Sequence, residues 1–205
     1  MFRTLTPMVR TLLLINVGAY ALQVLLGDAP LLRLALWPWG ADKLYGAPPF
    51  EIWQLLTYGF LHGGWTHLFF NMFALYMFGP DIEDLFGSRR FLYYYLACVV
   101  GAALVQLAVM YWIFHSAVPT VGASGGVFGL LLAYGMAFPR RQLMLLFPPI
   151  PLPAWLFVTL YGVAELFMGI FGTSQGVAHF AHLGGMAAGY LLIRYWRRHP
   201  LRRRR

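Results

Sequence analysis

Ser124 and His182 have the side-chain types needed for nucleophilic catalysis, and each lies at the start of a long apolar segment. A serine hydroxyl becomes a useful nucleophile when a neighbouring imidazole accepts its proton. A polar or ionisable side chain at membrane depth is costly and usually has a function. We therefore take Ser124 as the candidate nucleophile, and we look for its general base among the histidines near His182.

Residues 122–125 (Gly-Ala-Ser-Gly) form a small-residue turn before an apolar run, which predicts that Ser124 lies near a helix N-terminus. Backbone N–H groups there have no intrahelical acceptor and can point at an oxyanion. Gly122 would let backbone and substrate approach closely. Gly122, Ser124 and Gly126 also match the G-x-S-x-G pattern, but that motif requires a preceding strand, and the context here is helical. Tight helix packing is the alternative role of these small residues.

His67 and Asn71 lie four residues apart in a segment otherwise rich in Leu, Phe, Met and Ala. At this spacing one helix face presents both side chains to the same point. Together with the backbone N–H of Ser124 they could hold an oxyanion. Alternatively, they bond to neighbouring backbone or to each other and hold the helices together.

His179 and His182 are three residues apart, so they share a helix face and could in principle bind a metal. A metal site would need a third ligand, and no H-E-x-x-H motif is present. We therefore predict no metal and no other cofactor. Glu165 is the only acid within an apolar segment, and no acid is placed by the sequence to orient His182. For Glu165 we expect a buried hydrogen bond or a role in gating.

The composition excludes an ordinary soluble protein. The chain is 60% hydrophobic and 11% charged, whereas globular chains carry about 25% charged residues. The net charge of +8 does not indicate nucleic-acid binding, because nine of the fifteen cations lie at or near the two ends. The single cysteine, Cys98, lies in an apolar run and is expected to pack as a small apolar residue.

Long apolar runs predict an all-α, polytopic membrane protein with six transmembrane helices in a single domain over residues 1–205. Neither a cleavable signal peptide nor an internal repeat is evident. Clusters of Gly, Pro or Arg, such as Gly79-Pro80-Asp81, separate the runs. The expected spans are 8–27, 57–79, 91–114, 123–138, 152–171 and 178–196.

The arginines predict the orientation. Thirteen of the fifteen cations fall on one side of a six-span arrangement, and only Arg33 and Lys43 fall on the other. The side with the excess of Lys and Arg is expected to be cytoplasmic, so we expect both termini in the cytoplasm, with 197–205 as a basic tail. A bacterial inner membrane is the expected location. Three tryptophans in residues 28–56 predict that this outer loop lies partly in the membrane interface.

The fourth span is too short to cross a bilayer. From Gly125 to Phe138 it would measure about 21 Å, against a hydrocarbon core of about 30 Å. With its Pro139 end at the cytoplasmic surface, Ser124 would lie on the order of 10 Å below the outer surface. Irregular backbone at that depth requires a protein-lined or water-filled cavity. Small residues on the fourth and sixth spans, including Gly129 and Gly185, predict close packing of the two helices.

In the motifs around His67, Ser124 and His182, and in their order, the chain resembles the rhomboid family of intramembrane serine proteases over about residues 45–195. The resemblance implies a Ser124–His182 dyad with His182 as the base, and His179 as a supporting residue of the cavity. It also implies an aromatic ring packed on the base. Phe128 stands where many rhomboids have tyrosine, and Gln54 stands where many have arginine.

The resemblance further implies proteolysis of single-span membrane proteins within or near the lipid bilayer, without nucleic acid as a partner. An alternative is a catalytically silent relative that binds membrane clients for quality control. A solute or ion transporter is disfavoured, because paired intramembrane charges and inverted repeats are absent from the sequence.

Overall fold

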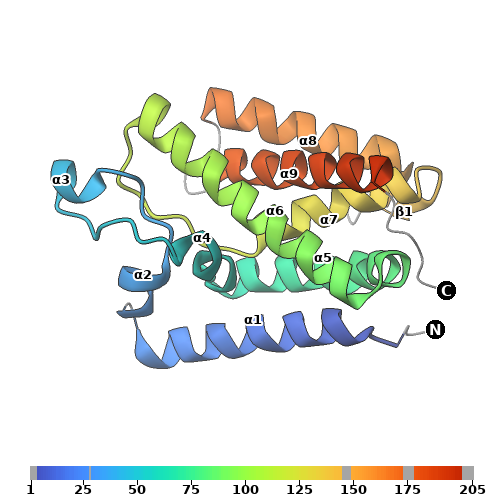
Figure 1. Cartoon of the computed structure of the whole chain (residues 1–205), viewed down its shortest axis with the longest axis horizontal. Helices are drawn as coiled ribbons and strands as arrows, with labels where there is room; N and C mark the ends of the chain where they lie inside the picture. The colour runs from blue at the N-terminus through green and yellow to red at the C-terminus, as the bar shows by residue number, and fades with distance from the viewer. Residues whose placement is uncertain (1–3, 28, 145–148, 173–177, 200–205) are drawn as a thin grey trace.

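Long helices dominate the structure, a computed structural model that describes residues 4–27, 29–144, 149–172 and 178–199 (Figure 1). This mostly helical architecture agrees with the predicted helical bundle. The principal helices are α1 (Pro7–Leu26), α5 (Trp65–Phe86), α6 (Ser88–Val109), α7 (Ser124–Ala137), α8 (Ala154–Phe171) and α9 (His179–Arg198). A π-helical turn, η2 (Met110–Phe114), extends α6. Most of the expected basic tail, including Arg202–Arg205, lies outside the described residues, as does Arg3.

Three helical segments within the described residues are long and apolar enough to cross a membrane: Pro7–Leu26, Ser88–Phe114 and Ala154–Phe171. Helix α7 is apolar but has only 14 residues, as predicted for the fourth span. Helices α5 and α9 have 22 and 20 residues, but each ends in a charged segment. The chain is therefore a multi-helix protein with several membrane-length apolar helices.

The expected second span, 57–79, is placed incorrectly, because the helix observed there begins at Trp65 and continues to Phe86. Residues before it form the short helices α4 (Gln54–Thr57) and η1 (Tyr58–Phe60) and then a loop. Pro80 lies inside α5 instead of ending it. Contacts on both sides stabilise this end of the helix: Gly79 packs against Val9, and Asp81 forms an ion pair with Arg141 at 2.8 Å.

The all-α prediction also missed a short antiparallel ribbon, in which β1 (Gln142–Met144) pairs with β2 (Pro151–Pro153). Pro153 disfavours helical backbone at the preceding Leu152, which favours extended structure at β2 rather than an earlier start of α8. The ribbon leads directly into α8, where the Ala154 N–H donates to the Arg141 carbonyl oxygen at 2.9 Å.

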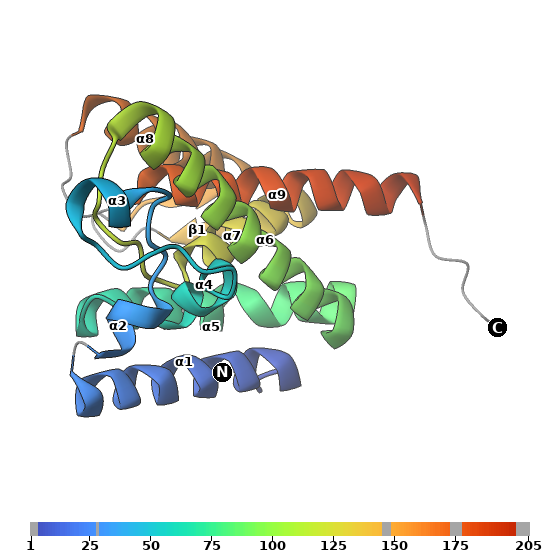
Figure 2. The same ribbon diagram turned by 60° about the vertical axis from the view of Figure 1, so that its left-hand side comes forward.

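Helix α1 packs on α5 at one side of the bundle, and α8 and α9 lie at the other, as both views show (Figures 1 and 2). The carboxylate of Glu83 anchors the start of α1, accepting the N–H groups of Met8 at 3.0 Å and Val9 at 2.8 Å. The hydroxyls of Thr6 and Ser88 donate to the same carboxylate. Glu83 is 2% exposed, so these donors compensate a charge that water scarcely reaches.

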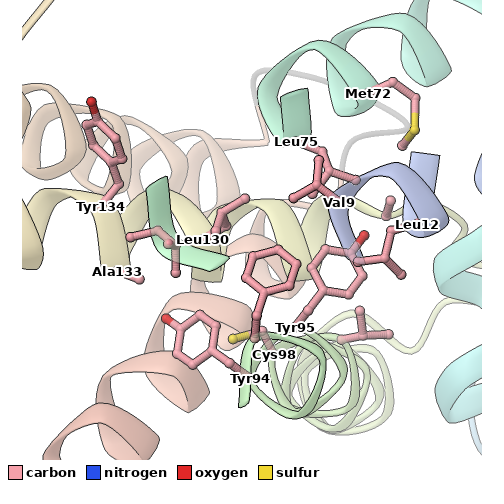
Figure 3. Close-up of a cluster of buried hydrophobic side chains, with 14 of the residues drawn as sticks. Val9, Leu12, Met72, Leu75, Tyr94, Tyr95, Cys98, Leu130, Ala133 and Tyr134 are labelled. Atoms are coloured by element: carbon pink, nitrogen blue, oxygen red, sulfur yellow. The ribbon is translucent and has the colours of Figure 1, made fainter. Parts of the chain in front are cut away.

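The core lies where α6 and α7 meet α1 and α5 (Figure 3). Cys98 is fully buried there beside Tyr94, as expected of a small apolar residue. The predicted close packing of the fourth and sixth spans is confirmed: a Cβ on Gly185 of α9 would lie 2.0 Å from the carbonyl oxygen of Gly125 on α7. Only glycine at position 185 permits α9 to approach α7 this closely.

The segment between α1 and α5 contains the short helices α2 (Ala29–Leu34) and α3 (Ala41–Tyr45). Gln54 is 1% exposed, and its side-chain oxygen accepts the backbone N–H of Trp37 at 3.1 Å. Its amide donates to the carbonyl oxygens of Pro49 at 3.3 Å and Arg33 at 3.4 Å. Gln54 therefore anchors this segment through a buried side-chain amide.

Candidate active site

Ser124 and His182 meet where the first turns of α7 and α9 approach each other. Ser124 is the first residue of α7, and His182 lies in the first turn of α9. His182 Nε2 is 2.9 Å from Ser124 Oγ, which is hydrogen-bond distance. The glycine contact between Gly125 and Gly185 brings the two helices close enough for this bond. The geometry is that of a nucleophile paired with a general base.

Phe128 covers one face of the His182 ring. The two rings are stacked, with centroids 4.1 Å apart and planes inclined by 6°. Phe128 lies one helical turn after Ser124, so both side chains project from the same face of α7. Tyr161 of α8 stacks on Phe128 in turn, at 5.1 Å and 16°. The aromatic ring expected against the histidine is therefore present, and a second ring supports it.

His67 lies against the backbone before Ser124. Gly122 has φ +132°, and a Cβ there would lie 2.7 Å from His67 Cε1, so this turn has no room for a side chain. The Gly63 N–H donates to His67 Nδ1 at 3.3 Å. In a neutral imidazole the proton then resides on Nε2. Nε2 lies on the Gly122 side of the ring, close to Ser124, and can serve as a donor there.

Asn71 lies one turn further along α5 and is 5% exposed. Its Nδ2 donates to the carbonyl oxygen of His67 at 3.0 Å, which is the local bonding foreseen as the alternative to an oxyanion role. An amide group has two N–H donors, and this bond uses one of them. His67 and Asn71 thus lie on one face of α5, as their spacing predicts.

These side chains border a cavity of about 1210 Å³ between α5, α7, α8 and the start of α9. The volume is ample for a segment of polypeptide, since small-molecule pockets measure about 300–1,000 Å³. Its walls are largely apolar, and the polar residues of the candidate site in them are Ser124, His67, Asn71, Glu165, His179 and His182. Thr66, Gln106, Ser116, Thr120 and Tyr161 add further polar groups to the lining.

Glu165 is the site residue that the sequence analysis did not place. Its Oε2 is 2.8 Å from His182 Nδ1 and 2.7 Å from His179 Nδ1. The sequence placed no acid beside His182, and the structure places Glu165 there; the expected buried hydrogen bond is present. The sequence feature that marks Glu165 as a candidate site residue is an acidic side chain within an apolar segment. Sequence spacing gave no partner for it, because the two histidines lie on the next helix.

Glu165 also adds a third candidate metal ligand beside His179 and His182, which the sequence alone did not provide. Their candidate ligand atoms lie within 4.8 Å of one another. In the structure, however, the histidine Nδ1 atoms are engaged with the carboxylate. A nitrogen that donates a proton to a carboxylate has no lone pair left for a cation. We therefore interpret the three residues as a hydrogen-bonded cluster and not as metal ligands.

Comparisons with known proteins agree with the features of this site. The family profile described as "Rhomboid domain" matches residues 49–199. "Rhomboid-like protein 11, chloroplastic" of Arabidopsis thaliana is 34% identical over 164 residues, covering 75% of this chain and 56% of the relative. "Putative rhomboid protease YdcA" of Bacillus subtilis is 32% identical over 143 residues, covering 69% of this chain and 66% of the relative.

A third relative, "Rhomboid protease GlpG" of Klebsiella pneumoniae, is 26% identical over 184 residues, covering 89% of this chain and 60% of the relative. The chain thus spans less than two thirds of the length of each of these three relatives. The matched profile covers most of the chain and includes every residue of the candidate site. The chain therefore belongs to the rhomboid family.

Proposed function

We propose that this protein is an intramembrane serine endopeptidase that cleaves transmembrane segments of membrane proteins. The observation that carries the proposal is the 2.9 Å contact between Ser124 Oγ and His182 Nε2 in the wall of a cavity of about 1210 Å³. Relatives named as rhomboid proteases support the same activity. No metal and no cofactor enter the mechanism.

The reaction begins when Ser124 Oγ attacks the carbonyl carbon of the scissile peptide bond and its proton passes to His182 Nε2. The tetrahedral intermediate then collapses, the C–N bond breaks, and His182 returns the proton to the leaving amine. An acyl-enzyme ester on Ser124 remains. A water molecule then attacks this ester and gives its proton to His182 Nε2. The bond between the acyl carbon and Ser124 Oγ breaks, His182 returns the proton to Oγ, and the carboxyl product is released.

The developing oxyanion is held by the backbone N–H of Ser124, by His67 Nε2–H and by the Asn71 amide. Ser124 opens α7, where N–H groups lack intrahelical acceptors. The hydrogen bond from Gly63 to His67 Nδ1 leaves Nε2 as the protonated nitrogen of that ring. Gly122 supports the turn that places these donors beside the nucleophile, and its missing side chain leaves room for His67.

We place the protein in the membrane with six spans and both termini in the cytoplasm, as expected for a bacterial inner membrane. Helix α7, at 14 residues and about 21 Å, reaches only part of the way across a hydrocarbon core of about 30 Å. Ser124 then lies below the outer surface, and the cavity admits the water that hydrolysis consumes. The polar groups of the site face this cavity rather than lipid.

The substrate must present an extended peptide bond to Ser124, because a carbonyl within an intact helix is already hydrogen-bonded and shielded. We therefore expect single-span substrates whose transmembrane helix is locally unstable, with glycine or other small residues near its outer end. The apolar walls of the cavity suit such a segment, and include Phe70, Val127, Leu131 and Met168.

The test is cleavage of a panel of labile transmembrane substrates by the purified protein in proteoliposomes. Ser124→Ala and His182→Ala should each abolish cleavage while expression and melting temperature remain unchanged. His179→Ala should impair cleavage less than His182→Ala, and EDTA should have no effect. A serine-directed fluorophosphonate should label the wild type but not Ser124→Ala. Substrate binding without cleavage or labelling would instead indicate a silent, client-binding rhomboid.

A further inference from the structure

We propose that Glu165 is a positioning residue for His182, so that the site is a Ser124–His182–Glu165 triad instead of a dyad. The inference rests on the proposed function, because it concerns the base of that reaction. Glu165 is 4% exposed and comes from α8, a helix that contributes neither the nucleophile nor the base. Its carboxylate touches the imidazole on the side away from the serine.

The proton positions follow from the two distances. His182 Nδ1 is 2.8 Å from Glu165 Oε2, and His182 Nε2 is 2.9 Å from Ser124 Oγ. A carboxylate only accepts hydrogen bonds, and a neutral imidazole has one N–H. The proton therefore resides on Nδ1, and the lone pair of Nε2 faces the serine hydroxyl. Without Glu165, the other tautomer, which is useless as a base toward Ser124, would compete.

Phe128 and Glu165 constrain different motions of the same ring. Phe128 lies parallel to the His182 imidazole and prevents it from tilting, but a stacked face leaves rotation within the ring plane open. The in-plane hydrogen bond from Nδ1 to Glu165 stops that rotation. The ring is thereby fixed in the orientation that Ser124 requires. Such preorganisation avoids a reorganisation cost at the moment of reaction.

His179 completes the arrangement by holding the carboxylate. Its Nδ1 donates to the same oxygen, Oε2, at 2.7 Å, so one carboxylate of α8 joins two histidines in the first turn of α9. Among the described residues, His179 Nε2 has no hydrogen-bond partner. His179 therefore acts on the site through Nδ1 and Glu165, which explains why His179→Ala is expected to be milder than His182→Ala.

The carboxylate also matters once the proton has moved. When Nε2 accepts the serine proton, His182 becomes an imidazolium on a side chain that is only 8% exposed. A carboxylate at 2.8 Å stabilises that cation, and Glu165 itself stays unprotonated throughout. Other titratable groups around His182 and Glu165 are His179 on α9, Tyr161 on α8 and His67 on α5.

Glu165→Gln tests the proposal, with Glu83→Gln as the matched control. Both substitutions remove a buried carboxylate without changing its shape, but Glu83 binds the start of α1 and lies outside the cavity. We expect Glu165→Gln to lower kcat by about 10²–10⁴-fold, with KM and melting temperature little changed. Glu83→Gln should lower the melting temperature and leave the kcat of the folded protein unchanged.

The pH profile separates positioning from a structural role. Removing the carboxylate makes the His182 imidazolium harder to form, so the acidic limb of kcat/KM should move to lower pH in Glu165→Gln and not in Glu83→Gln. A Glu165→Gln enzyme with wild-type kcat and an unmoved acidic limb would overturn the proposal. So would a loss of activity that merely follows loss of folded protein.

A measurement without turnover distinguishes failure of this inference from failure of the proposed function. In ¹⁵N-histidine NMR of Ser124→Ala in detergent micelles, His182 should report the Nδ1–H tautomer with a strongly hydrogen-bonded proton. That signature should disappear when Glu165→Leu is added, because leucine offers the Nδ1–H no acceptor, whereas glutamine would keep an accepting amide oxygen. Its persistence would refute the role of Glu165 even if the enzyme cleaves substrate. Loss of the signature would support the hydrogen bond between His182 Nδ1 and Glu165 even if no substrate is cleaved.

Discussion

Phe128 and His182 lie face to face, with ring centroids 4.1 Å apart and ring planes inclined by 6°. This contact joins α7 to α9 directly beside the bond between Ser124 and His182. Because Phe128 also stacks on Tyr161, it places the imidazole in a column of three rings drawn from three helices.

The first prediction concerns this stack. Phe128→Leu should lower kcat by about 2–13-fold, corresponding to the roughly 0.5–1.5 kcal/mol that aromatic pairs contribute beyond burial. Phe128→Tyr keeps the ring and should retain near-wild-type activity. The measurement is steady-state cleavage of a fluorescent transmembrane substrate. A Phe128→Tyr variant as impaired as Phe128→Leu would contradict a role that depends on stacking.

The second prediction concerns the oxyanion donors on α5. His67→Ala and Asn71→Ala should each lower kcat by about 10²–10³-fold, with KM and melting temperature changed little. His67→Ala should lower kcat more than Asn71→Ala, because Asn71 already donates one of its two amide protons to the backbone carbonyl of His67. The measurements are cleavage kinetics and thermal melting in the same detergent. Melting temperatures that fall in step with activity would assign both residues a structural role.

The third prediction concerns the contact between α7 and α9. Gly185→Ala places a methyl group 2.0 Å from the Gly125 carbonyl oxygen, so the helices must separate. Overpacking of this kind costs about 1–3 kcal/mol, and it should also lengthen the contact between Ser124 and His182. We expect a lower melting temperature together with a lower rate of fluorophosphonate labelling.

The control for that variant is Gly18→Ala on α1, because a Cβ at Gly18 meets no atom within 4 Å. Alanine there should leave labelling unchanged and slightly raise stability, since glycine inside a helix costs about 0.5–1 kcal/mol relative to alanine. Equal labelling rates in both alanine variants would show that close helix contact is not needed to bring the base to the nucleophile.

The fourth prediction concerns topology. Reporter fusions at residues 42 and 118 should lie outside, and fusions at 85, 141 and 205 should lie in the cytoplasm, because the arginines favour that side. Alkaline phosphatase and fluorescent-protein fusions measure the two locations. A C-terminus on the outside would contradict both the six-span arrangement and the proposed depth of Ser124.

Sequence alone was sufficient where the signal is local. Composition and long apolar runs indicated a helical membrane protein, and the short run after Ser124 predicted a 14-residue helix. Glycine spacing predicted the contact between α7 and α9, and the spacing of His67 and Asn71 placed both on one face of α5. In each case the residues involved lie within a few turns of one helix, or the motif itself indicates close approach.

Tertiary structure decided what depends on how helices lie beside one another. Pro80 remains inside α5 because contacts from α1 and from Arg141 hold the helix end, which a sequence rule for proline does not foresee. Glu165 reaches His182 because α8 packs against α9 and both side chains line one cavity. A hydrogen bond depends on tenths of an ångström, whereas apolar periodicity fixes only which residues are buried, so the acid partner of His182 was visible only in the folded chain.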